Sequence, residues 1–486
     1  MRSGGWIVLA AMALGLGPSG QVAPAIADGG ASGAAAVTSA IEKGVAFLLK
    51  DQRPDGGWAS REYVMSSPGH VMAITAVACD ALLASTQSDD AVEAAGKGVE
   101  FLRKNAEGLN GAVLNDGFDF KAWGAAYGLV HLHGMRANWP AKAKPPETDS
   151  LIEAFVKYAA RTQHPCGGWT YLTDKVDPGS EKDGSISFLT GVMLEGLTLC
   201  RPKAAPIARA VEDLKNAADK DGRFEYSHHG HYESARGGGI TKEESAGRSV
   251  QAAYTLDLAG SPVEDLAGYV DRFFEVREEF VKTRNSHPHA KPFMIAGYYY
   301  YHGHAYAARA MRRLVERDPK QRAALAGHVA TLTKSLLGEQ AQDGSWMDAP
   351  CGDRPYATAL ALLTLRDVQT MALPWAESVA RAVEIAKPDG KLVVVLFGDG
   401  GEASKQLERT LADAKLDGLR DSFVWAKCDQ RADAAVWKEA KIGSAPLLAV
   451  LGPAKAYSVA ATVSRLAGKS TAAQVEGFLK RALSGK

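Results

Sequence analysis

One short segment recurs along the chain and constrains its fold more than any other feature. The first copy, KGVAFLLKDQRPDGGW, runs from Lys43 to Trp58 and is typical of the end of an amphipathic helix followed by a Gly-rich turn. Its Gln52 can bond exposed backbone groups at the helix end, and Trp58 offers a large apolar ring with one N–H donor. The segment, called the staple below, predicts a helix end that is fastened to a neighbouring element.

The staple is repeated at regular intervals. Further copies end at Trp169 and Trp346, and a partial copy from Lys97 to Leu102 has Asn105 in place of the glutamine and no tryptophan. The three staple glutamines are separated by 111 and 177 positions, which are two and three periods of about 55 to 59 residues. That period is close to those of arrays of two-helix units, so we expect the repeat unit to be a helix hairpin.

The residues of the first copy carry a family resemblance. Lys43-Gly44, Phe47-Leu48, Gln52 and Gly56-Gly57-Trp58 resemble the QW repeat of squalene/hopene cyclases and of protein prenyltransferase β subunits. The resemblance implies a mainly α fold, an α/α toroid of about six helix hairpins over residues 38–370, in which an outer ring of helices surrounds an inner ring.

Helical periodicity gives an outer and an inner helix for each hairpin. Outer helices are expected near 38–51, 90–105, 148–163, 204–219, 264–284 and 322–341. Inner helices are expected near 70–85, 119–135, 185–201, 242–260, 297–314 and 356–368. Thr241 and Ser185 are suited to cap the N-termini of two of the inner helices.

This order places all the long loops from outer to inner helices on one face of the ring, called the loop-rich face below. The inner helices present their N-termini to the same face, where their dipoles favour a partly negative ligand, unless capping side chains already satisfy the free N–H groups. Because loops on a rigid scaffold commonly carry function, we expect a central cavity and a site there.

Histidines gather in the fourth and fifth repeats and suggest a metal site. His228 and His231 lie in one loop, and His287 and His289 lie in the next. If these loops lean inward, four imidazoles could converge on one ion, for which zinc is the natural choice. The alternative interpretation is that these are solvated loop histidines together with one or two buried in the core.

A second candidate cluster begins the fifth inner helix. Tyr298 and His302 belong to a run of tyrosines and histidines that could transfer protons or line a pocket. His304 cannot converge with His302, because a spacing of two on a helix separates side chains by about 200°. Asp119 and Arg236, on loops of the same face, complete the set of catalytic candidates. The alternative interpretation is that such polar groups form salt bridges and caps between loops.

The catalytic motifs of the resembling families are missing. Asp116-Gly-Phe-Asp119 lacks the adjacent acids of the cyclase Asp-x-Asp-Asp cluster, and Asp348-Ala-Pro-Cys351 has the wrong spacing for the prenyltransferase zinc pair. We therefore expect a toroid that binds a small molecule, a polymer or a protein partner. The alternative is an enzyme acting on an isoprenoid or glycan substrate at the loop-rich face, with or without a metal.

The ends of the chain and its composition bound the remaining possibilities. A length of 486 residues predicts two domains, and 56 basic against 56 acidic residues give no basic surface that would indicate nucleic acid. Residues 1–27 have the pattern of a removable secretory signal, followed by a flexible lead at 28–37, so we expect an exported bacterial protein, periplasmic or secreted, without a transmembrane anchor. Five sparse cysteines predict no disulfide framework, although Cys166 and Cys351 share a Pro-Cys-Gly context in which they could pair or bind a metal.

The last hundred residues follow a different pattern. Leu392–Phe397, Ser422–Cys428 and Leu447–Leu451 are apolar runs typical of buried strands, with helices predicted from Glu402, Arg431 and Thr471. The order of elements over 388–486, with Pro446 before the third strand, resembles the thioredoxin fold, which implies a cis proline. The resembling family has a Cys-x-x-Cys pair where this chain has Asp399-Gly-Gly-Glu402. We expect a contact module without redox activity.

Overall fold

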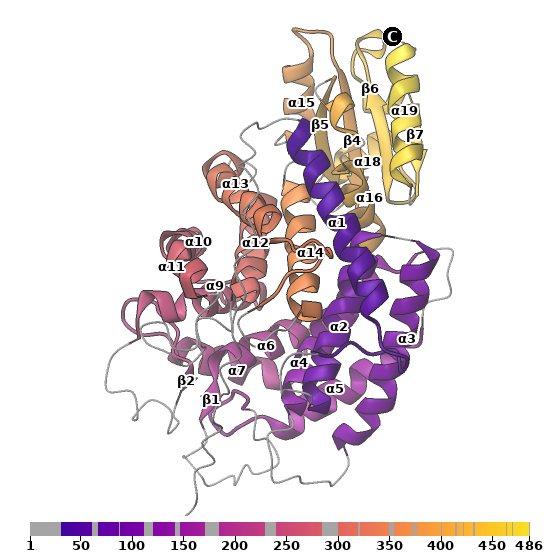
Figure 1. The fold of residues 1–486 in the computed structure, drawn as a ribbon. Helices are drawn as coiled ribbons and strands as arrows, with labels where there is room; N and C mark the ends of the chain where they lie inside the picture. The colour runs from indigo at the N-terminus through magenta and orange to yellow at the C-terminus, as the bar shows by residue number, and fades with distance from the viewer. Residues whose placement is uncertain are drawn as a thin grey trace, which may run out of the picture.

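The computed structural model shows two units, a large helical ring and a small α/β domain beside it (Figure 1). The structure describes residues 31–60, 67–86, 88–110, 120–140, 146–170, 184–228, 240–283, 300–318, 321–348, 354–371, 375–376, 378–399, 401–413, 416–420, 422–430, 433–462, 464–468 and 470–485.

The ring is the predicted α/α toroid, and within the described residues it has six inner helices. These are α2 (Pro68–Ser85), α4 (Lys121–Asn138), α6 (Ser187–Cys200), α9 (Lys242–Leu258), α12 (Tyr300–Arg317) and α14 (Arg354–Met371). The outer ring consists of α1 (Ala31–Asp51), α3 (Asp89–Ala106), α5 (Asp149–Thr162), α7 (Pro206–Asn216), α10 (Leu266–Glu275) with α11 (Arg277–Thr283), and α13 (Gln321–Glu339). Each inner helix packs against the next, and α14 packs against α2, which closes the ring.

Small elements lie between these helices. A 3-10 turn, η1 (Glu107–Asn110), follows α3, and two short strands, β1 (Ser185–Ile186) and β2 (Ser227–His228), pair antiparallel. Thr241 caps α9 as expected, accepting a hydrogen bond from the N–H of Glu244. Ser185 does not cap α6, because it lies in β1 and its hydroxyl donates to Asp213 at 2.7 Å.

The staple glutamine fastens its own turn to the next outer helix. Gln52 Nε2 donates to the carbonyl of Gly56 at 2.9 Å and to that of Ala94 in α3 at 2.8 Å. Both other copies make the same two bonds, from Gln163 to Gly167 and Pro206, and from Gln340 to Gly344 and Ala40. Because Ala40 belongs to α1, the third staple joins the last repeat to the first.

The staple tryptophan fills the space between hairpins. Trp58 is fully buried, its Nε1 donates to Leu48 O at 2.8 Å, and its backbone N–H donates to Thr75 Oγ1 of α2 at 3.0 Å. Its ring packs under Gly98, where a Cβ would lie 3.2 Å from the indole. Trp346 packs under Gly44 of α1 in the same way, so a glycine on the next outer helix makes room for both of these rings.

A glycine makes the close approach of the turn possible. Gly56, Gly167 and Gly344 have φ values of 89°, 112° and 88°, a region that side chains disfavour. A Cβ at Gly56 would lie 2.5 Å from the carbonyl oxygen of Lys97 on the next outer helix. The Gly-rich turn of the sequence repeat is therefore required both by backbone conformation and by packing.

The structure adds a degenerate copy of the staple that the sequence pattern did not reveal. Phe224 occupies the place of the tryptophan in the fourth repeat, is buried, and donates its N–H to Ser249 Oγ of α9 at 3.1 Å. In the partial copy, Asn105 bonds only Phe101 of its own helix, at 2.8 Å. The fifth repeat has an outer helix divided at Val276 into α10 and α11.

The α/β domain has a five-stranded sheet in the order β3-β5-β4-β6-β7. Strands β3 (Trp375–Ala376), β5 (Phe423–Asp429) and β4 (Leu392–Gly398) are parallel, whereas β6 (Leu447–Leu451) and β7 (Ser464–Ala467) continue the sheet antiparallel. The remaining elements are α15 (Val379–Ala386), α16 (Glu402–Leu411), α17 (Asp417–Arg420), α18 (Ala434–Ala440), η5 (Pro453–Lys455), η6 (Val459–Ala461) and α19 (Ala472–Ser484). Apolar clusters cover both faces of the sheet.

The predicted strands and helices of this domain are present, and the Ala445–Pro446 peptide is cis. The sheet begins earlier than residue 388, because β3 pairs with β5 and α15 packs on β4 and β5. The apolar stretch that forms β3 is too short to be recognised as a strand from its sequence.

The two units contact each other at the end of the ring where the inner helices finish. Helix α16 packs against α4 and α14, and α17 packs against α1 (Figure 1). One described helix, α2, is long and apolar enough to cross a membrane, but 89% of that stretch is buried inside the protein, as expected for an inner-ring helix.

Candidate ligand-binding site

A polar cavity of about 140 Å³ lies in the middle of the ring, and all six inner helices contribute to its wall. The lining residues come from the C-terminal halves of these helices: Asp80, Ala84, Val130, His133, Gly134, Ala137, Asn138, Glu195, Leu199, Tyr254, Arg309, Arg312, Leu363, Arg366 and Asp367. The cavity therefore lies toward the face that the α/β domain contacts, on the side opposite the loop-rich face. A space of this size holds several water molecules or a small ligand.

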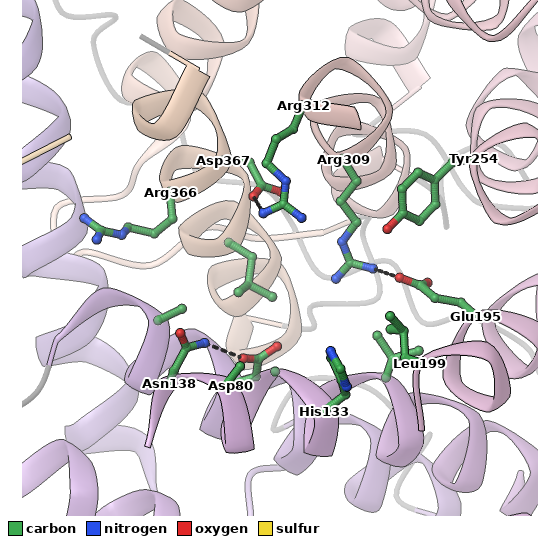
Figure 2. A pocket seen from close by; sticks show the side chains of 15 residues that line it. Asp80, His133, Asn138, Glu195, Leu199, Tyr254, Arg309, Arg312, Arg366 and Asp367 are labelled. Atoms are coloured by element: carbon green, nitrogen blue, oxygen red, sulfur yellow. Dashed lines mark hydrogen bonds and ion pairs between the residues drawn. The ribbon is translucent and has the colours of Figure 1, made fainter. Parts of the chain in front are cut away.

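One wall of the cavity is basic and is built on α12. Arg309 Nη1 donates to Glu195 Oε1 at 2.8 Å, and Arg312 Nη1 donates to Asp367 Oδ1 at 2.8 Å. Both side chains project toward the same space, because they are three residues apart on one helix (Figure 2). Asp367 is the main cause that raises the pKa of Arg312.

Glu195 orients Arg309. Its carboxylate is 2% exposed, and its second oxygen accepts the hydroxyl of Tyr306 at 2.5 Å. Arg309 also lies over the ring of Tyr306, 4.9 Å from its centroid. Two partners thus fix the guanidinium in place at the cavity edge.

The opposite wall is acidic and is built on α2 and α4. Asp80 is buried, its Oδ2 lies 2.8 Å from His131 Nδ1, and its Oδ1 accepts Asn138 Nδ2 at 3.3 Å. Gly134 makes room for this carboxylate, since a Cβ there would lie 2.3 Å from both Asp80 oxygens. Figure 2 shows His133 beside Asp80, facing the arginines across the cavity.

An aromatic layer separates the cavity from the loop-rich face. The Tyr127 hydroxyl bonds His302 Nδ1 at 3.0 Å and the Tyr356 hydroxyl at 2.7 Å, while His302 Nε2 lies 3.3 Å from Gln251 Oε1. These side chains come from α4, α9, α12 and α14 and are buried. Trp123 packs over them, with ring centroids 5.6 Å from Tyr127 and 6.2 Å from Tyr356.

His302, a predicted catalytic residue, belongs to this layer and does not line the cavity. Burial, followed by the nearby charge of Arg309, lowers its pKa to about 3, so the ring is neutral at ordinary pH. His304 faces the other way and accepts Arg277 Nε at 3.1 Å, as the helical spacing predicts. Arg277 also bonds Tyr300 and Glu339, which links α11, α12 and α13.

Most of the other predicted site residues lie outside the part of the chain that the structure describes. Tyr298, Asp119, Arg236, His231, His287 and His289 lie outside the described residues. His228 pairs through its backbone with Ser185 in the β1–β2 ladder. Among the described residues, no group of three or more histidine, cysteine or acidic side chains is placed to hold a metal ion. The four-histidine zinc site stays a prediction.

Among the described cysteines, Cys79 and Cys428 are buried, and Cys166 and Cys200 are half-buried. Cys79, Cys166, Cys200 and Cys428 are free, and Cys351 lies outside the described residues. Burial raises the pKa of Cys200 to about 11 and that of Cys428 to about 12, which disfavours a reactive thiolate.

Single charged residues within apolar inner helices could have indicated the cavity, although helical periodicity alone does not identify them. Asp80 is the one charged residue in the 18-residue helix α2, and Glu195 is the one charged residue in α6. A single charge within an otherwise apolar inner helix is costly to bury unless it is paired or faces a polar space. The residues 302, 306, 309 and 312 recur at helical spacing and form one stripe along α12.

Several solved structures are similar to part of this chain. Neither a protein-family model nor a curated protein matches this sequence. Among solved structures, the type II terpene cyclase MstE from Scytonema is 16% identical with a TM-score of 0.44, over 70% of this chain and 98% of that chain. An inactive variant of the α-1,6-mannanase GH76A of Salegentibacter sp. HEL1_6 is 9% identical with a TM-score of 0.43, over 68% of this chain and 98% of that chain. The Lin0763 protein from Listeria innocua is 14% identical with a TM-score of 0.42, over 71% and 97%.

Proposed function

We propose that the toroid is a binding module that holds a small polar molecule in the cavity at the C-terminal ends of its inner helices. The supporting observation is that all six inner helices contribute to the wall, which carries three acidic and three arginine side chains among its lining residues. Buried charges persist only where they are paired or where a polar partner occupies the space between them. A concave site with a few convergent polar groups is the usual form of a small-molecule site.

Blocking the cavity tests this proposal. A panel of sugars, sugar acids and amino acids is titrated against the full chain by calorimetry, and each hit is repeated on Leu199→Trp, which fills the cavity from α6. The control is Ile385→Trp on the exposed surface of α15. Binding that the Leu199 variant loses and the Ile385 variant keeps supports the proposal. Binding that survives in both variants, or no binding of any compound, contradicts it.

A second candidate function is catalysis on an isoprenoid or glycan substrate at the loop-rich face. It is favoured by the aromatic cluster at the start of α4, where Phe120 and Trp123 are half-buried and His70 packs 4.5 Å from Trp123. Such rings can hold an apolar chain or stack on a sugar. Incubation with a polyprenyl alcohol or an oligosaccharide, followed by mass spectrometry, should show turnover that Trp123→Ala abolishes. Unchanged substrate with the wild-type chain would count against an enzyme for these substrates.

We also propose export, with removal of residues 1–27 and a C-terminal thioredoxin-like domain that serves for contacts. The signal pattern and the Ala25-Ile26-Ala27 cleavage sequence support it. Mass spectrometry of protein from the periplasm of a bacterial host should find a chain that begins at Asp28. Recovery of the uncleaved chain in the cytoplasm would refute export.

A further inference from the structure

The charged cavity contains more hydrogen-bond donors than acceptors on its α12 wall. Arg309 carries five N–H groups, of which one is bonded to Glu195, and its side chain is only 12% exposed. A guanidinium held in a nearly buried position with most of its donors uncommitted needs acceptors from whatever occupies the adjacent space. That space is the cavity.

Arg312, which lies next to Arg309 on α12, adds further hydrogen-bond donors to the same wall of the cavity. One Nη bonds Asp367, and Nε, which lies 3.5 Å from Glu316, is buried without a hydrogen-bond acceptor. Figure 2 shows the two guanidinium groups next to each other, facing the same space. Two planar forks in this arrangement match the paired oxygens of an oxyanion.

The charges of the site divide between its walls. Arg309 and Arg312 are each paired with one carboxylate, Glu195 and Asp367, and keep further N–H donors on that side. The opposite wall carries the carboxylate of Asp80 with His131 against it. The basic wall thus offers N–H donors suited to the oxygens of an anionic group, and the acidic wall accepts hydrogen bonds from donors such as hydroxyl groups.

We propose that the ligand is a small hydroxylated carboxylate, of the size and kind of a sugar acid. Its carboxylate is held by Arg309 and Arg312, and its hydroxyl groups donate to Asp80 on the opposite wall. This inference rests on the proposed function and specifies the ligand class of the same cavity. It also makes Glu195 a positioning residue, because its two oxygens are engaged by Arg309 and Tyr306.

Four probes that share one sugar ring test the assignment. Calorimetric titration of the full chain compares D-glucuronate, D-glucose, D-glucosamine and D-glucose 6-phosphate. We expect D-glucuronate to bind at least about tenfold more tightly than D-glucose. Equal binding of D-glucose, or tighter binding of D-glucosamine, would overturn the carboxylate assignment while leaving the cavity proposal intact. Tighter binding of the phosphate would overturn it in favour of a dianion.

A charge-balanced variant separates recognition from folding. Arg309→Gln alone leaves the Glu195 carboxylate buried without a counter-charge, so the main variant is the double substitution Arg309→Gln/Glu195→Gln, which replaces the ion pair by two amides. We expect the preference for D-glucuronate over D-glucose to fall below about twofold, with D-glucose binding retained. Arg309→Lys keeps the charge but loses the planar pair of N–H donors. Its preference for D-glucuronate over D-glucose should lie between the preferences of the wild type and the double variant. Retention of the full preference by the double variant would refute the proposed role of Arg309.

Failure of the two proposals can be told apart. If no probe binds and the wider panel yields no ligand that Leu199→Trp excludes, the cavity proposal fails and this inference fails with it. If neutral sugars bind in a manner that Leu199→Trp abolishes, without preference for the acid, the cavity proposal stands and only the assignment of Arg309 and Arg312 falls.

Discussion

At the scale of single residues, the staple glutamine is a polar contact that connects neighbouring hairpins. Gln163 donates two hydrogen bonds, to Gly167 and to Pro206 of the next outer helix. Asn105, which occupies the corresponding place in the partial copy, bonds only its own helix. The two positions therefore form a natural pair in which one side chain links repeats and the other does not.

We predict that Gln163→Ala lowers the free energy of unfolding by about 1–3 kcal/mol, because two carbonyl groups lose their partner. Asn105→Ala should cost less than about 1 kcal/mol, because the carbonyl of Phe101 keeps its helical surroundings. Urea unfolding followed by circular dichroism measures both. Equal losses in the two variants would show that the glutamine does not link the repeats.

Also at this scale, the aromatic layer makes stability depend on pH. Burial lowers the pKa of His302 to about 3, whereas an unfolded histidine titrates near 6.5. Because the unfolded chain takes up the proton first, the contribution of neutral His302 is complete above pH 6.5 and is lost progressively as the pH falls toward 3. Linkage gives a loss of about 2 kcal/mol at about pH 5.

His302→Gln should reduce this acid sensitivity by about that amount, since an amide retains hydrogen bonding and cannot be protonated. Unfolding free energies of the wild type and variant are compared at about pH 7 and pH 5. The control is His328→Gln, which removes a half-buried imidazole of α13 that pairs with Asp271. A variant whose stability falls with acid as steeply as that of the wild type would contradict the account.

At the scale of helices, the ring is held together by close approach at small residues. Gly98 of α3 lies where a Cβ would be 2.2 Å from Cys79 Sγ and 3.2 Å from the Trp58 ring. Gly96, two residues earlier on the same helix, has nothing within 4 Å of its Cβ position. One glycine is thus required by packing, and the other only lowers helix propensity.

We predict opposite effects of alanine at these two positions. Gly98→Ala should lower the free energy of unfolding by about 1–3 kcal/mol, because the added methyl group must displace Cys79 or Trp58. Gly96→Ala should stabilise by about 1 kcal/mol through helix propensity. Thermal unfolding of the two variants and of the wild type measures these changes in stability. Stabilisation by both substitutions would mean that α3 does not pack closely on α2 at Gly98.

The helices themselves could be predicted from the sequence, because periodicity indicates them and the staple marks where three of the outer helices end. Periodicity located α2 and α14 to within three residues at each end. The degenerate fourth staple was missed, because Phe224 preserves the packing of the staple without its sequence pattern. The division of the fifth outer helix at Val276 also leaves no strong signal, since no proline or glycine marks it.

At the scale of the whole molecule, the position of the cavity could not be predicted. The order of the helices determines which face of the ring carries the long loops. The free space inside the ring depends instead on the combined sizes of side chains from six helices. Tyr127, His302 and Tyr356 fill the centre toward the loop-rich face, whereas Asp80, Gly134 and their neighbours leave space at the other end. The α/β domain contacts that same end of the ring.

Closure of the ring depends on one seam between the first and last repeats. Gln340 at the end of α13 bonds Ala40 of α1 across 300 positions of sequence, and Trp346 packs under Gly44 beside it. Helix α1 also contacts α14 and reaches α17 of the α/β domain. The seam therefore joins both ends of the toroid and the second domain.

We predict that Gln340→Ala opens the molecule locally at this seam. Amide hydrogen exchange, measured by mass spectrometry, should increase in α1 and α13, because a hydrogen bond between these two helices is lost. Gln163→Ala removes the equivalent bonds elsewhere and should instead increase exchange in α5 and α7. The two variants share the same chemistry and differ only in the seam they affect. If each variant raised exchange evenly around the ring, the toroid would open as a single unit and no individual staple would control its closure.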